Sequence, residues 1–119
     1  MAKRRIPIDD GRAALAEART GGAARAVLAT AVRYLLEELA ERAPGNTVEV
    51  RVPPFGATQC VQGPRHTRGT PPNVIETDPA TWIALATGEL DWETAIAEAR
   101  VRASGSRAEL VGLLPLVRV

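Results

Sequence analysis

A helical pattern of apolar residues runs between residues 23 and 42. Leucine and valine side chains recur there every three or four positions, which places them along one side of an α-helix. The stripe consists of Leu28, Val32, Leu35 and Leu39. Pro44 and Gly45 follow and break the pattern. The sequence therefore predicts a long helix over 23–42 that buries this stripe against a sheet.

The period changes from helical to alternating after the long helix. Valines at 48, 50 and 52 alternate with polar residues, which predicts a strand over 47–52 with one buried face. A less regular alternation predicts a second strand over 57–62, joined to the first by a short connection at Phe55-Gly56. Further short strands are predicted at 73–77 and 101–105.

The remaining helices are predicted from capping residues. Asp78 stands before Pro79, and Gly88 is placed to end that helix, while Asp91 begins the next. A first helix over 11–19 and a final one from Ser106 to Pro115 complete the set. We expect an α+β fold: a mainly antiparallel sheet of four or five strands with helices on one face. Residues 1–8 form a mobile basic N-terminus in this prediction, and residues 9–119 form a single domain.

Composition and charge exclude several classes of function. The 119 residues contain fifteen basic and fourteen acidic side chains, so the net charge of +1 gives no general attraction to nucleic acid. The strands at 47–52 and 57–62 also lack aromatic residues on which bases could stack. No apolar run approaches the roughly 18 residues of a membrane span, so stable insertion is not expected. With Cys60 as the single cysteine, no intrachain disulfide can form, and we expect a cytoplasmic protein.

Candidate catalytic groups are few. Cys60 and His66 could form a thiol–base pair, but no third residue is placed to orient them. One cysteine and one histidine do not supply the usual ligands of a zinc site. The aspartates at 9, 10, 78 and 91 stand where helix caps belong. We therefore expect no enzyme, no metal and no cofactor.

The segment 63–72 is rich in proline and glycine and carries Arg65, His66 and Arg68. Arginine side chains and free backbone amides suit a carboxylate or phosphate group. These three residues are therefore a candidate anion-binding loop, which we expect to fold back against the sheet. The alternative is a solvated connector that its prolines stiffen.

Several blocks of the sequence carry a family resemblance. They are the acid–helix–glycine–acid block over 78–91, the helix and strand over 95–105, the apolar run 110–116, and the stretches 51–56 and 63–69. In this order and spacing they resemble the sterol carrier protein family, in its short bacterial branch, over roughly residues 22–119. The family sheet has five strands, whereas the pattern here predicts four.

The resemblance implies a non-catalytic protein that holds a fatty-acyl chain, a sterol or another lipid in a tunnel between sheet and helices. The residues that would line it are Trp82, Leu85, Ile96, Leu110, Leu113 and Leu114. A second interpretation is a protein-interaction module on the same scaffold, with the cavity filled by its own side chains and the arginine-rich loop ordered. Its partner would be another protein or a second copy of the chain.

Overall fold

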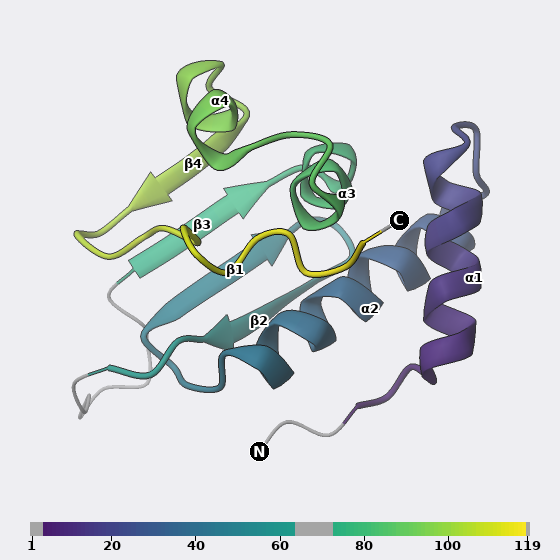
Figure 1. Ribbon diagram of the computed structural model, residues 1–119, viewed down its shortest axis with the longest axis horizontal. Coiled ribbons are helices and arrows are strands. Elements are labelled where there is room, and N and C mark those ends of the chain that lie inside the picture. Colours follow the sequence, from purple (N-terminus) through teal and green to yellow (C-terminus); the bar gives the residue numbers. More distant parts are fainter. Residues whose placement is uncertain (1–3, 64–72, 119) are drawn as a thin grey trace.

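The computed structural model describes residues 4–63 and 73–118 (Figure 1). Its helices are α1 (Ile8–Arg19), α2 (Arg25–Arg42), α3 (Pro79–Thr87) and α4 (Trp92–Ala97). Its strands are β1 (Val48–Val52), β2 (Gly56–Cys60), β3 (Asn73–Thr77) and β4 (Val101–Ser104). The α+β class and these predicted elements are confirmed, with boundaries that differ by a few residues.

The four strands form one sheet in the order β2-β1-β3-β4. Two of the three pairs are antiparallel as expected, but β1 and β3 run parallel at the centre of the sheet. The register explains this difference. Cys60 at the end of β2 and Asn73 at the start of β3 both lie opposite Val48. Strand β3 therefore starts at the end of the sheet where β2 finishes and β1 begins, so it runs parallel to β1.

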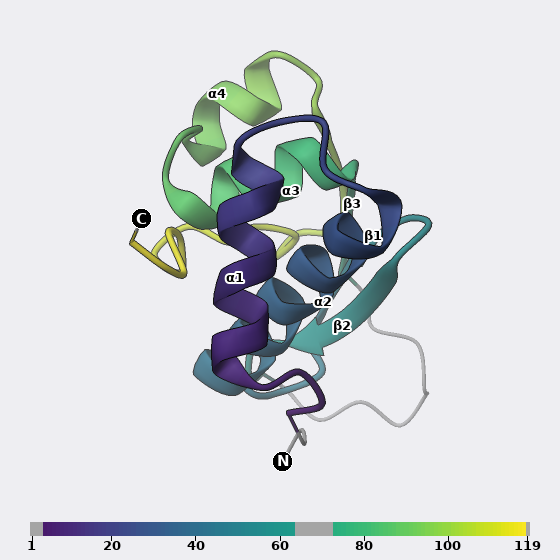
Figure 2. The same ribbon diagram turned by 90° about the vertical axis from the view of Figure 1, so that its right-hand side faces the viewer.

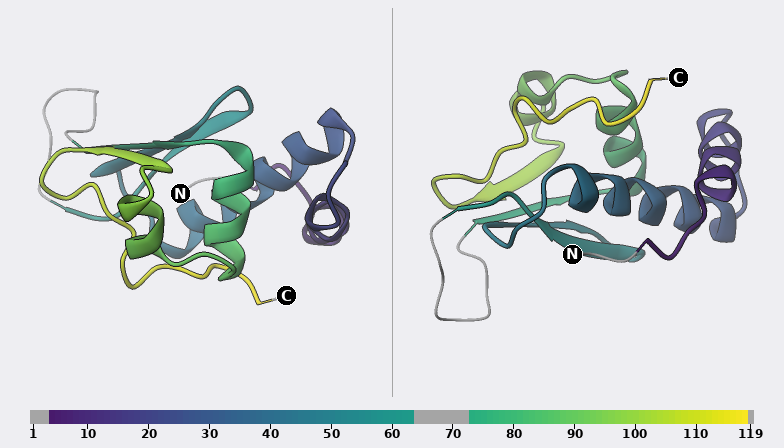
Figure 3. Two further views of the ribbon diagram at one scale, coloured as in Figure 1. Left: turned by 90° about the horizontal axis from the view of Figure 1, so that it is seen from above. Right: turned by 60° about the horizontal axis from the view of Figure 1, so that its bottom comes forward.

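The helices and the C-terminal chain cover one face of the sheet (Figure 3). Helices α2 and α3 lie on that face, and residues 105–118, here called the C-terminal segment, cross it toward α1 (Figure 1). Helix α1 lies over α2, away from the strands (Figure 2). In the part of the chain that the structure describes, no helix has both the length and the apolar character needed to cross a membrane.

Helix α2 is buried on two sides. Val32, Leu35 and Leu39 are fully buried, as the stripe predicted, whereas Leu28 is half-buried. Tyr34 is also buried, and its ring lies where α1 approaches most closely. A Cβ on Gly11 would come within 2.2 Å of that ring, so glycine is required for this helix contact. The sequence pattern identified the first buried side and not the second.

The predicted caps of α3 and α4 are present. The Asp78 carboxylate accepts hydrogen bonds from the Thr81 backbone N–H and hydroxyl, both at 2.8 Å. Asp91 accepts from the Thr94 N–H at 2.7 Å, and hydrogen bonds from Thr94 hold its pKa below the ordinary range. Gly88 ends α3 with a left-handed φ of 84°. These caps define both ends of α3 and the start of α4.

The helix predicted from Ser106 to Pro115 is wrong. The C-terminal segment forms turns there, and Gly112 has a φ of +85°. Hydrogen bonds within the segment, such as the one from the Leu113 N–H to the Leu110 carbonyl, close single turns, whereas the Leu116 and Val117 N–H groups both donate to the Ala86 carbonyl of α3. Of the leucines predicted to share a helix face, Leu110 is 1% exposed, but Leu113 and Leu114 are half-buried. Leu110 and the equally buried Leu116 therefore anchor an irregular chain in the core.

Candidate functional site

A groove of about 890 Å³ lies between α1, the second half of α2 and the end of the C-terminal segment. We call it the α1 groove. Its volume is in the range of small-molecule sites. Buried Leu15, Tyr34 and Leu116 contribute to its walls, together with half-buried Val117. The full lining comprises Ile8, Arg12, Leu15, Ala16, Arg19, Tyr34, Glu38, Arg42, Pro115, Leu116, Val117 and Arg118.

The charged side chains of the α1 groove are four arginines and one glutamate. Arg19 pairs with Glu89 at 3.0 Å, and the Arg42 Nε lies 3.7 Å from Glu38, beyond a good hydrogen bond. Arg12 and Arg118 form no ion pair with any other described residue. The groove therefore combines apolar walls with an excess of positive charge.

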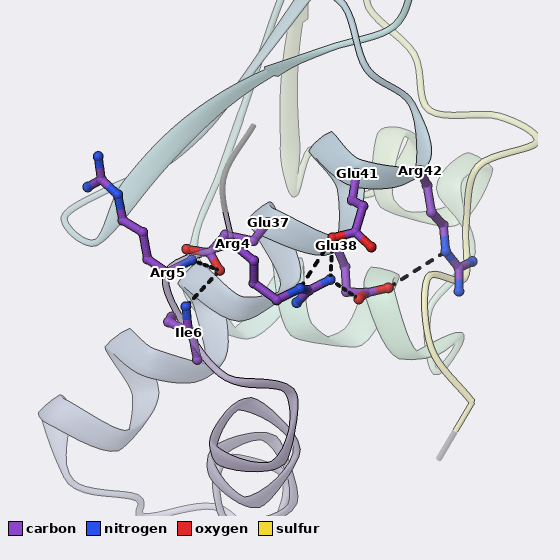
Figure 4. A network of polar contacts seen from close by, with 7 residues as sticks. All are labelled: Arg4, Arg5, Ile6, Glu37, Glu38, Glu41 and Arg42. Carbon is purple, nitrogen blue, oxygen red and sulfur yellow. Dashed lines mark hydrogen bonds and ion pairs between the residues drawn. The ribbon is translucent and has the colours of Figure 1, made fainter. Parts of the chain in front are cut away.

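The first described residues hold α1 in position (Figure 4). The Arg4 guanidinium donates to Glu38 and, at 2.9 Å, to Glu41, and its Cζ lies 5.6 Å from the centre of the Tyr34 ring. The N–H groups of Arg5 and Ile6 donate to the Glu37 carboxylate at 3.1 and 3.0 Å. These contacts hold residues 4–6, part of the segment expected to be mobile, against α2.

A smaller groove of about 240 Å³ lies beside the C-terminal segment on the side of α3 and α4. We call it the Leu110 groove. Three of the predicted lipid-wall residues line it: Leu85, Leu110 and Leu114. Trp92 and Val111 extend its apolar surface, while Asp91 and Glu93 place carboxylates in its lining. Segments far apart in the sequence thus meet around one apolar depression.

The other three predicted wall residues lie elsewhere. Trp82 is fully buried, and its indole N–H donates to the Val32 carbonyl at 3.3 Å. Ile96 is 42% exposed on α4. Leu113 lines a separate groove of about 480 Å³ near Val61. The structure thus places the six residues in the core, on the surface and in two different grooves.

Cys60 is fully buried, and this burial raises the pKa of its thiol to about 11. The thiol is therefore protonated at neutral pH and a poor nucleophile. His66, the partner considered for it, lies outside the described residues, as do Arg65 and Arg68 of the candidate anion-binding loop. Among residues 4–63 and 73–118, no group of three or more histidine, cysteine or acidic side chains could hold a metal ion.

A family model described as bacterial SCP ortholog, in which SCP stands for sterol carrier protein, matches residues 24–116. This is most of the chain. The chain belongs to this family. No curated protein matches it.

The residues that match the bacterial sterol carrier protein orthologue family begin one residue before α2 and end at Leu116. We call them the family region. The sheet, α2 to α4 and the Leu110 groove all lie within it. Helix α1 lies before it, so one wall of the α1 groove comes from outside the family region.

Sequence reasoning missed the α1 groove. A signal was present in α1 itself, where Gly11, Ala14 and Leu15 are buried and recur at helical spacing. That spacing indicates a helix with one apolar side, but it does not show which surface the side meets. That Arg12 lines the same groove as residues 115–118 depends on tertiary structure.

Proposed function

We propose that this protein binds a lipid-class ligand without catalysis, as a carrier of a fatty-acyl chain, a sterol or another apolar molecule. Membership of the bacterial sterol carrier protein orthologue family is the observation that carries the proposal. The proposed site is on the helical side of the sheet, at the Leu110 groove. Its apolar lining from α3, the turn before α4 and the C-terminal segment supports this location.

The irregular backbone of the C-terminal segment supports ligand entry at this place. Within the described chain, its Leu116 and Val117 amides bond to one carbonyl of α3 instead of forming a ladder. Val111 is 57% exposed, and Leu113 and Leu114 are half-buried. In the proposal, the ligand displaces leucine side chains of this segment and thereby enlarges a groove that is small without ligand. Trp82, Ile96 and Leu113 stay candidate wall residues only for such an opened state.

The competing function is a protein-interaction module on the same scaffold. The fully buried Trp82, Leu35 and Leu85 favour it, because they fill the space between α2, α3 and the sheet with the chain's own side chains. Exposed Ile96 and Val111 would then contribute to a surface for a protein partner or a second copy. Either function proceeds without a metal, a cofactor or a nucleophile, and we place both in the cytoplasm.

Native mass spectrometry of the protein purified from its host separates the two functions. A co-purifying lipid mass, together with saturable binding of a fluorescent fatty acid to the delipidated protein, supports the carrier. A clean apo mass and no saturable binding contradict it. Replacing Leu114 by Trp fills the Leu110 groove and should abolish binding at that groove. Val74→Trp places the same bulk in β3, outside the groove lining, and should leave binding unchanged.

A further inference from the structure

We propose that the α1 groove is a separate binding site for an amphiphile with one alkyl chain and an acidic head group. The alkyl chain lies along Ile8, Ala16 and Val117, and the head group lies at Arg12 and Arg118. The site goes beyond lipid binding at the Leu110 groove, because it uses a helix outside the family region and selects its ligand by charge.

The walls of the α1 groove suit an alkyl chain. Leu15 on α1 and Leu116 on the C-terminal segment are 3% and 1% exposed, so they form a packed floor beneath the groove. The apolar surface open to a ligand comes from Ile8, which is 46% exposed, and from exposed Pro115. Val117 is half-buried beside them, and the small Ala16 leaves room on the α1 side. Removing apolar surface from water is the main driving force for binding such a chain. Because the floor of the groove is already packed, it does not need to reorganise when an alkyl chain binds.

The charges of the α1 groove favour an anion over a cation. Glu38 is the acidic side chain among the lining residues, and it already accepts a hydrogen bond from Arg4 and lies near Arg42. In the described chain, Arg12 and Arg118 lie on the groove without a carboxylate partner. Guanidinium groups donate paired hydrogen bonds to carboxylate or phosphate oxygens. The head group would therefore be acidic, whether carboxylate or phosphate.

The groove exists before any ligand binds because α1 is held at both ends. The Arg4 contacts with Glu38 and Glu41 lie just before its first turn (Figure 4). The Arg19 side chain, in its last turn, bonds to Glu89 at 3.0 Å. A site held in this way needs less ordering on binding than one that a flexible chain must assemble.

Ligands of equal chain length and different head group test the proposal. Dodecanoate, dodecyl phosphate and dodecylamine, each below its critical micelle concentration, are titrated into the full chain and followed by amide NMR and calorimetry. We expect both acids to bind with shifts centred on Ala16, Leu116 and Val117, and the amine to bind several-fold more weakly. The relative affinity of the two acids identifies the preferred head group.

Variants of the arginines supply the matched control. Arg12→Gln with Arg118→Gln should lower the affinity for dodecanoate about fivefold, as expected for exposed charge pairs. Arg5→Gln with Arg102→Gln makes the same change of net charge outside the groove lining and should have no effect. Ala16→Trp, which fills the α1 groove, should abolish binding at that groove, while Ala13→Trp on the exposed side of α1 should not.

Five results would overturn the inference. Four come from the unmodified protein: equal affinity for acid and amine, chemical-shift changes confined to Gly112 and the rest of the Leu110 groove, no saturable binding, and chemical shifts of Leu116 that change with protein concentration when no ligand is present. The second would leave the lipid-carrier proposal intact. The fourth would identify the groove as a contact between copies of the chain. The fifth comes from the variants: loss of binding in Leu114→Trp with retention in Ala16→Trp would support the carrier and reject this site.

Discussion

Cys60 shows how position in the sheet sets the chemistry of one residue. It ends β2 opposite Val48, and both side chains are fully buried on the helical side of the sheet. Burial disfavours the charged thiolate and raises the pKa of the thiol from 9.0 to about 11. The side chain therefore behaves as a small apolar group of the core.

The shifted pKa of Cys60 makes stability depend on alkaline pH. Because the folded protein binds the thiol proton more tightly than the unfolded chain, the contribution is complete below about pH 9 and is lost as the pH rises toward 11. The expected loss is at most about 2–3 kcal/mol in the free energy of unfolding. Urea titrations from pH 8 to 11 measure it, with Cys60→Ala as the control that lacks this titration. Parallel pH profiles of the two proteins would contradict the assignment.

At the scale of elements, the contact of α1 with α2 depends on Gly11. Alanine normally stabilises a helix interior by about 1 kcal/mol relative to glycine. At this position the added Cβ would lie 2.2 Å from the Tyr34 ring, which is buried and cannot move without cost. Packing and helix propensity thus act in opposite directions at one residue.

We expect packing to dominate, so that Gly11→Ala lowers the free energy of unfolding by about 1–3 kcal/mol. Thermal and urea unfolding measure this change. Ala13→Gly, at an exposed position of the same helix, gives the propensity contribution alone and should cost about 1 kcal/mol. A more stable Gly11→Ala variant would show that α1 does not approach Tyr34 closely.

Elements defined by short-range patterns were predictable from the sequence, and their long-range arrangement was not. The α2 stripe, the alternation of Val48, Val50 and Val52, and the caps at Asp78 and Asp91 depend on neighbouring residues. The parallel pairing of β1 with β3 depends on where two strand ends meet. The leucines after Ser106 have helical spacing, yet the chain forms turns there and the Leu116 N–H bonds to Ala86 in α3. Only the folded chain places Arg12 in the same groove as residues 115–118.

At the scale of the whole molecule, the C-terminal segment is part of the hydrophobic core, although it has no regular secondary structure. Leu110 and Leu116 are about as buried as the core leucines of α2, and the Leu116 amide is bonded to α3. The segment also borders both the α1 groove and the Leu110 groove, and Pro115 lines each of them. A ligand in either groove would therefore contact the same piece of chain.

Replacing Leu116 by Ala should cost about 2–5 kcal/mol in the free energy of unfolding, as for other buried leucines. Val111→Ala in the same segment is the control. Its side chain is 57% exposed, so the change should stay within about 0.5 kcal/mol. Equal, small effects of the two substitutions would mean that the segment is not anchored in the core.

The position of α1 also has a consequence for local unfolding. Because α1 packs on α2 and lies away from the strands (Figure 2), it can detach without breaking a bond of the sheet. Its amide protons should therefore exchange with solvent deuterium through an opening that costs less than global unfolding. The amides of β1, paired on both sides, should exchange only with the whole domain. An amphiphile held between α1 and Leu116 would slow exchange in α1 first, and leave β1 unchanged until the whole domain is stabilised.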